Sequence, residues 1–135
     1  MRKAYIDANI ILRLITGDPP EMAECAARLF QQADEGKLRL IVESVVLAET
    51  VWTLSSFYGF APSDIAPILS TLLVSDGIES RDKLLLLQAL VLYQEKNIDF
   101  ADALLAAAML NSGIRQVYSF DAHLDRVEGI NRAEP

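Results

Sequence analysis

The sequence predicts an α/β fold in which a mainly parallel sheet is covered by helices on both faces. Short β-type apolar runs alternate along the chain with helical stretches of about ten to sixteen residues. This alternation requires crossover connections, which join parallel strands. The 135 residues are 52% apolar, enough for a sizeable core. We find no internal repeat, low-complexity segment or linker, so we expect one domain over residues 1–135.

Turn and capping residues divide the first half of the chain. Gly17 and the two prolines after Asp18 separate two helices, because glycine and proline interrupt regular structure. Gly36 closes the second helix, and Ser44 is suited to cap the next one. The predicted elements are a strand over 4–6, a helix over 10–15, a helix from the prolines to Gly36, a strand over 38–42 and a helix over 44–59.

The second half of the chain repeats the alternation. Pro62 opens a helix, and Asp82 starts another whose residues 84–92 are almost wholly apolar. Gly113 stops an alanine-rich helix that begins at Asp99. The predicted elements are helices over 62–75, 82–97 and 99–111, strands over 77–80, 115–120 and 129–132, and a helical turn over 122–127.

Charge and metal-ligand composition exclude several classes of protein. The chain has 19 acidic and 12 basic residues, a formal charge of −7 that is unusual for a nucleic-acid-binding protein. The lone Cys25 excludes a disulfide framework and cysteine-based zinc sites. The lone His123 makes a histidine-dependent triad a poor hypothesis. Any catalysis is therefore expected to depend on carboxylates.

We expect a cytoplasmic protein with no membrane partner. The longest charge-free run lies between Glu49 and Asp64, which is shorter than the roughly 18 residues of a spanning helix. Near the N-terminus, Asp7 interrupts the apolar stretch that a signal peptide would need.

Four carboxylates lie where a strand ends or a helix begins, among residues that belong in a core. They are Asp7, Glu49, Asp102 and Asp121. An unpaired buried carboxylate costs several kcal/mol, so such residues need a partner, a proton or a cation. No basic residue is adjacent in sequence to any of them. Oxygen ligands of this kind suit Mg²⁺ or Mn²⁺, which can promote phosphodiester cleavage.

Each carboxylate also has a purely structural interpretation. Asp7 and Asp121 are suited to start turns, and Glu49 can point to solvent from its helix. Asp99 and Asp102 fit the cap and third position of a helix, where carboxylates satisfy free N–H groups. The joint pattern of the four shifts the balance toward a metal site.

That joint pattern resembles the acidic motifs of the PIN domain, and most closely those of VapC-type toxin ribonucleases. The segments that carry the resemblance are residues 5–12, 46–49, 99–107 and 118–121, in the family's order and spacing. The resemblance spans residues 4–127. It implies a three-layer α/β/α sandwich with a mainly parallel sheet of four or five strands. It also implies metal-dependent RNA hydrolysis.

The resemblance assigns roles to individual residues. Asp7, Glu49, Asp102 and Asp121 match the catalytic, metal-binding acids. Asn9 and Ser119 match residues that orient carboxylates or waters. Asp99 and Asp125 are further candidates, and the existence of a fifth acidic ligand stays open.

The resulting hypothesis is an endoribonuclease toxin of a toxin–antitoxin pair that binds Mg²⁺ or Mn²⁺ and hydrolyses RNA with a metal-activated water. The resemblance also implies a protein antitoxin and a homodimer as partners. Two alternatives stay open. One is a PIN-like binding module without catalysis, and the other is a haloacid-dehalogenase-like phosphatase that uses Asp7 after the first strand.

Overall fold

The computed structural model describes residues 2–135 and contains five strands, all paired in parallel. The first sheet has the order β1-β2-β3, formed by β1 (Arg2–Tyr5), β2 (Leu38–Ile41) and β3 (Ile78–Glu79). The second sheet pairs β4 (Gln116–Tyr118) with β5 (Asn131–Ala133). The predicted α/β class with parallel pairing is confirmed.

Six helices and one 3₁₀ turn connect the strands. They are α1 (Ala8–Thr16), α2 (Pro20–Asp34), α3 (Ser44–Ser56), α4 (Pro62–Val74), α5 (Lys83–Lys96), α6 (Phe100–Ser112) and η1 (Ala122–Arg126). The left-handed residues Gly17, Asn97 and Gly113 end α1, α5 and α6. The bounds agree with the sequence prediction to within a few residues.

One continuous core runs through both halves of the chain, from Ile6 to Ile130. Helix α5 packs on α4 and on α6. Its predicted apolar stripe is only partly buried: Leu86 and Leu90 are fully enclosed, whereas Leu84 is 82% exposed. On α6, small alanines allow close packing of the helix against its neighbours.

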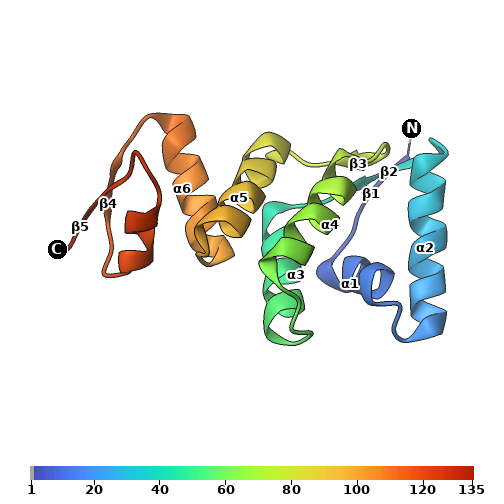
Figure 1. Ribbon diagram of the computed structural model, residues 1–135. Coiled ribbons are helices and arrows are strands. Elements are labelled where there is room, and N and C mark those ends of the chain that lie inside the picture. The colour runs from blue at the N-terminus through green and yellow to red at the C-terminus, as the bar shows by residue number, and fades with distance from the viewer. Residues whose placement is uncertain (1) are drawn as a thin grey trace.

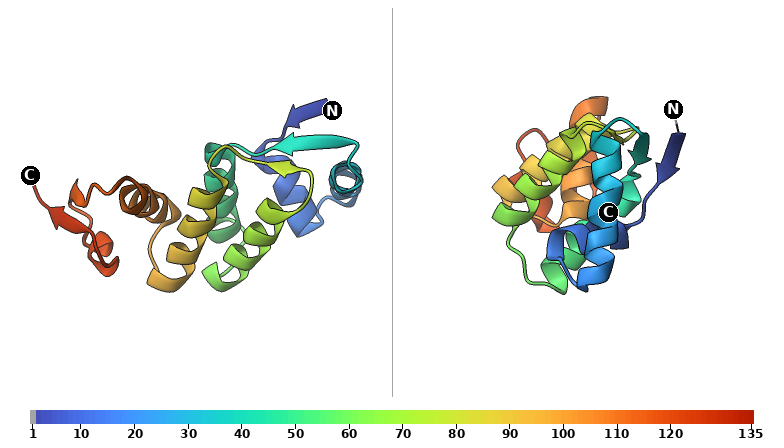
Figure 2. Two further views of the ribbon diagram at one scale, coloured as in Figure 1. Left: turned by 90° about the horizontal axis from the view of Figure 1, so that it is seen from above. Right: turned by 90° about the vertical axis from the view of Figure 1, so that its right-hand side faces the viewer.

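The two sheets lie at opposite ends of an elongated molecule (Figure 1). Helices α5 and α6 stand between them, and the view from above shows the same separation (Figure 2). The predicted number of strands is therefore present, but as sheets of three and two strands. The division arises because the α4–α5–α6 packing places β4 away from β1.

The backbone at Gly77, just before β3, gives a test of this packing. A Cβ at Gly77 would collide with the carbonyl oxygen of Ala33 in α2, and its φ of +83° is in the left-handed region. Gly36 has a similar φ of +78° but open space around it. We expect Gly36→Ala to lower the free energy of unfolding by about 1 kcal/mol, from backbone strain alone.

Gly77→Ala should lower the free energy of unfolding by about 1–3 kcal/mol more than Gly36→Ala does, because the collision with rigid backbone adds to the strain. Urea denaturation of both variants measures the difference. Equal losses in the two variants would contradict the close approach of α2 to Gly77.

Candidate metal centre

The carboxyls of Asp102 and Asp121 lie against each other, although the two residues are 19 positions apart in sequence. Asp102 belongs to the first turn of α6, and Asp121 follows β4. Burial raises the pKa of Asp102 to about 6, and contact with the Asp121 carboxyl and its charge acts in the same direction. The Oδ2 atom of Asp102 is buried and has no hydrogen-bond partner among residues 2–135. A buried oxygen in this state needs a proton or a cation.

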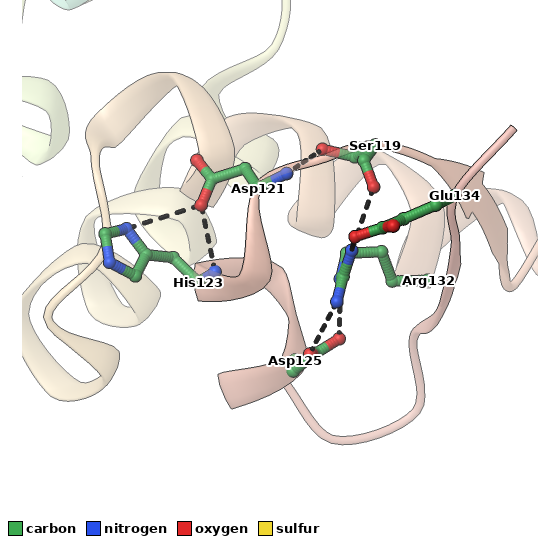
Figure 3. Close-up of polar contacts among 6 residues, drawn as sticks. All are labelled: Ser119, Asp121, His123, Asp125, Arg132 and Glu134. Atoms are coloured by element: carbon green, nitrogen blue, oxygen red, sulfur yellow. Dashed lines mark hydrogen bonds and ion pairs between the residues drawn. The ribbon is translucent and has the colours of Figure 1, made fainter.

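The loop after β4 fixes the second carboxylate (Figure 3). The backbone N–H of Asp121 donates to Ser119 Oγ at 2.9 Å, and Asp121 Oδ1 accepts from the backbone N–H of His123 at 2.9 Å. The His123 Nδ1 atom lies 3.4 Å from the same oxygen. The His123 N–H bond, followed by contact with Asp102, lowers the pKa of Asp121. Asp121 is therefore charged at neutral pH, while Asp102 holds its proton more tightly.

Arg132 of β5 organises the same loop. Its Nε and Nη2 atoms donate to the two Asp125 oxygens at 3.0 and 3.1 Å, and its Nη1 atom donates to the Ser119 carbonyl at 3.0 Å. Only 15% of the Arg132 side chain is exposed. Both oxygens of Asp125 are thus engaged by arginine, which competes with the additional ligand role considered for it. Neither the role of Arg132 nor the contact of His123 with Asp121 was predicted from the sequence.

Glu49 and Asp99 share a hollow between α3 and α6. This hollow has a volume of about 620 Å³ and is lined mainly by apolar groups, including Trp52 and Tyr93. Both carboxylates are exposed. Asp99 stands at the N-cap of α6, yet its side chain makes no capping hydrogen bond within the described chain. The predicted core environment of Glu49 is wrong, because its helix turns this residue outward between Val45 and Trp52.

Asp7 lines a different hollow from the one that Glu49 and Asp99 share. It caps α1, where its Oδ1 atom accepts from the N–H of Ile10 at 3.2 Å, and it is exposed. It opens on a second hollow of about 590 Å³, together with Asn9 and Arg13. Across residues 2–135, no three acidic, histidine or cysteine side chains gather closely enough to hold a metal ion. The structure brings Asp102 and Asp121 together and leaves Asp7 at the end of β1.

The sequence matches a known protein family. The model of the PIN domain matches residues 4–130. The chain belongs to the PIN family. A VapC ribonuclease from Aquifex aeolicus (strain VF5) is 25% identical over 115 residues, which cover 85% of this chain and 84% of the relative. The match agrees with the resemblance noted in the sequence.

The donor set of this PIN domain fits a hard divalent cation. All candidate ligands are carboxylates, which Mg²⁺ and Mn²⁺ prefer over nitrogen or sulfur donors. The unpartnered Asp102 oxygen beside Asp121 is a position that a cation would satisfy.

Residues 2–135 contain no helix both long and apolar enough to cross a bilayer.

The raised pKa of Asp102 predicts a specific pH dependence of stability in protein treated with a chelator. Because the folded state holds this proton more tightly than the unfolded state, stability is lost as the pH rises from about 4 through 6. Asp102→Asn removes that loss. We expect its melting temperature at pH 7.5 to exceed that of the parent protein by a few degrees, with no difference near pH 4.

Asp125→Asn is the control, because Arg132 lowers the pKa of Asp125. The charged form of Asp125 stabilises the fold at pH values above the ordinary pKa of aspartate. The Asp125→Asn variant should therefore have a lower melting temperature than the parent protein at pH 7.5. A destabilised Asp102→Asn protein at pH 7.5 would contradict the crowding of Asp102 and Asp121.

Proposed function

We propose that the protein is a metal-dependent endoribonuclease and the toxin of a toxin–antitoxin pair. Membership of the PIN family and similarity to a VapC ribonuclease support this function. The observation that carries it is the buried, unpartnered oxygen of Asp102 against the carboxyl of Asp121. That pair is unfavourable in the absence of a cation, and the motif resemblance matches both residues to metal-binding acids of the PIN domain.

In this proposal Asp102 and Asp121 hold Mg²⁺ or Mn²⁺, and Asp7 and Glu49 supply further oxygen ligands. Asp99 lies one helical turn from Asp102 and shares the hollow of Glu49, so it is a further ligand candidate. A bound ion would activate water and stabilise the leaving oxygen of a phosphodiester, yielding 5′-phosphate and 3′-hydroxyl ends. Asp102 must release its proton to act as a ligand, so metal affinity should rise with pH.

Other residues of the chain position these ligands. Ser119 Oγ fixes the backbone of Asp121. Asn9 lines the same hollow as Asp7 and would orient a water or that carboxylate. Arg132 and Asp125 brace the loop and are assigned no metal in this proposal.

The acidity of the protein is consistent with RNA binding confined to the site. Two divalent ions would change the formal charge from −7 to about −3 and concentrate positive charge where a phosphate approaches. Affinity for RNA should then be modest and local, since no long basic face contributes to it. An acidic site also favours a cationic segment of a protein antitoxin as a partner.

We further propose a single domain over residues 1–135, a cytoplasmic location and self-association as a dimer.

Cleavage of RNA with purified protein tests the function. We expect cleavage with Mg²⁺ or Mn²⁺, none with a chelator, and none in Asp102→Asn or Asp7→Ala, because each removes a ligand. Glu95→Gln, which neutralises an exposed carboxylate on α5, is the matched control and should retain full activity. Gel analysis of a labelled RNA measures the products.

The same assay distinguishes the alternatives. Folded protein that neither cleaves RNA nor melts higher with Mn²⁺ would identify a binding module without catalysis. Release of phosphate from a phosphomonoester, lost in Asp7→Ala, would support the phosphatase.

The hydroxyl of Ser119 allows a finer test. Ser119→Ala removes the acceptor for the N–H of Asp121 and should lower the cleavage rate by about 10–100-fold, as for other residues that orient metal ligands. Ser119→Thr keeps a hydroxyl and should retain most of the rate. If Ser119 positions a metal ligand, the alanine variant alone should need more Mn²⁺ for half-maximal cleavage. A misfolded variant would lose activity without this shift in Mn²⁺ dependence.

A further inference from the structure

Strand β1 has an open edge. Within residues 2–135 it pairs with β2 alone, and it lies outermost in the first sheet (Figure 2). The second half of the strand carries no protecting charge, and Tyr5 is 69% exposed. Natural sheets usually shield such an edge with charges, prolines or a covering element. Arg2 and Lys3 charge the first half of β1, so its uncharged second half at Ala4 and Tyr5 is the part suited to pair with another strand.

Strand β4 has a matching open edge at the other end of the molecule. Within the described chain it pairs with β5 alone. The segment Val117-Tyr118-Ser119-Phe120 has no charge and no proline, and Tyr118 and Phe120 are 73% and 74% exposed. Both open edges therefore combine exposed aromatic side chains with free backbone groups.

Parallel pairing of these two edges would join the separated carboxylates. Asp7 follows the carboxyl end of β1, and Asp121 follows the carboxyl end of β4. The carboxyl ends of parallel strands lie at the same edge of a sheet. A β1–β4 pair would thus bring Asp7 next to the Asp121–Asp102 pair. Without that pairing, residues 2–135 of one chain bring no three possible ligands together.

The packing of one chain keeps its own β4 away from its own β1. Helices α5 and α6 pack on each other between the two sheets, and Leu86 and Leu90 of α5 and Ala106 of α6 are fully buried. Pairing within the chain would have to break these contacts. A second copy related by a two-fold axis can offer its β4 to β1 and accept β4 in return, so that all four edges are used at once.

We propose that two copies of this chain pair reciprocally, β1 of each with β4 of the other, forming two five-stranded parallel sheets of order β3-β2-β1-β4-β5. Each nuclease site is then divided between the copies, with Asp7 from one chain and Asp102 and Asp121 from the other. The assignment of these carboxylates as metal ligands rests on the proposed function, whereas the strand pairing rests on the two open edges.

Cysteine cross-linking between differently labelled chains tests the pairing without any use of nuclease activity. In a Cys25→Ser background, Tyr5→Cys is placed in one chain and Tyr118→Cys in a second chain that carries a size tag. Both tyrosines are exposed, so the substitutions leave the core intact. We expect the mixed disulfide to form in high yield on oxidation of the co-expressed chains. Gln116→Cys, two residues earlier on the same face of β4, replaces Tyr118→Cys to sample the neighbouring register.

Leu84→Cys is the matched control for β1. It is 82% exposed but lies at the start of α5, so it should not cross-link with Tyr118→Cys. Absence of the mixed disulfide from both β4 positions would overturn the proposal. A monomeric mass, with an internal disulfide in a chain carrying both Tyr5→Cys and Tyr118→Cys, would also overturn it in favour of closure within one chain.

Complementation then tests the division of the site. Asp7→Ala and Asp121→Asn chains should each be inactive alone. Random pairing of the two should restore about one quarter of the parental activity, because half of the dimers are mixed and each mixed dimer has one intact site. Cross-linking without any RNA cleavage by the parent protein would retain the strand pairing and reject the proposed function. Cleavage by the parent with no restoration in mixed dimers would overturn the divided site.

Discussion

The contact between Asp102 and Asp121 is the constraint on which the functional interpretation depends. Two carboxyls that touch in a partly buried setting cannot both carry full charge without a compensating cation. The pKa of Asp102 rises to about 6, while the N–H of His123 helps to keep Asp121 ionised. The protein maintains this arrangement with Ser119 and Arg132, which hold the loop after β4. A carboxyl pair with pKa values shifted in opposite directions is typical of functional sites.

Local structure followed from the sequence because its determinants are local. Gly17 and Gly113 end helices by adopting left-handed backbone, and the prolines at 19 and 20 start α2 at its first turn. The strands followed from short apolar runs between such signals. These features depend on a few neighbouring residues, and the predicted α/β class with parallel pairing agrees with the structure.

Long-range placement was harder to predict. The division into two sheets depends on how α5 packs between α4 and α6, and no residue of β1 or β4 records that packing. Glu49 has apolar neighbours in sequence, but the helical turn directs it outward with Val45 and Trp52. The role of Arg132 was hidden because an arginine in a terminal strand carries no sequence signal for its partner Asp125. The acidic motifs identified the residues to examine, while their distances from one another depend on tertiary packing.

A site divided between two chains would link assembly to metal binding. Each isolated chain holds Asp102 and Asp121 together and Asp7 apart, which keeps the third negative charge away from the other two. Pairing of β1 with β4 of the second copy would bring Asp7 next to Asp102 and Asp121 and increase the repulsion among the three carboxylates. Dimerisation should therefore be less favourable without a cation. A cation that binds the completed ligand set more tightly than the separated one stabilises the dimer by that difference in affinity. Under the two proposals, metal and partner chain therefore reinforce each other. The separation of β1 from β4 is then a property of the incomplete assembly, and the exposed aromatic edges are the surfaces that assembly covers.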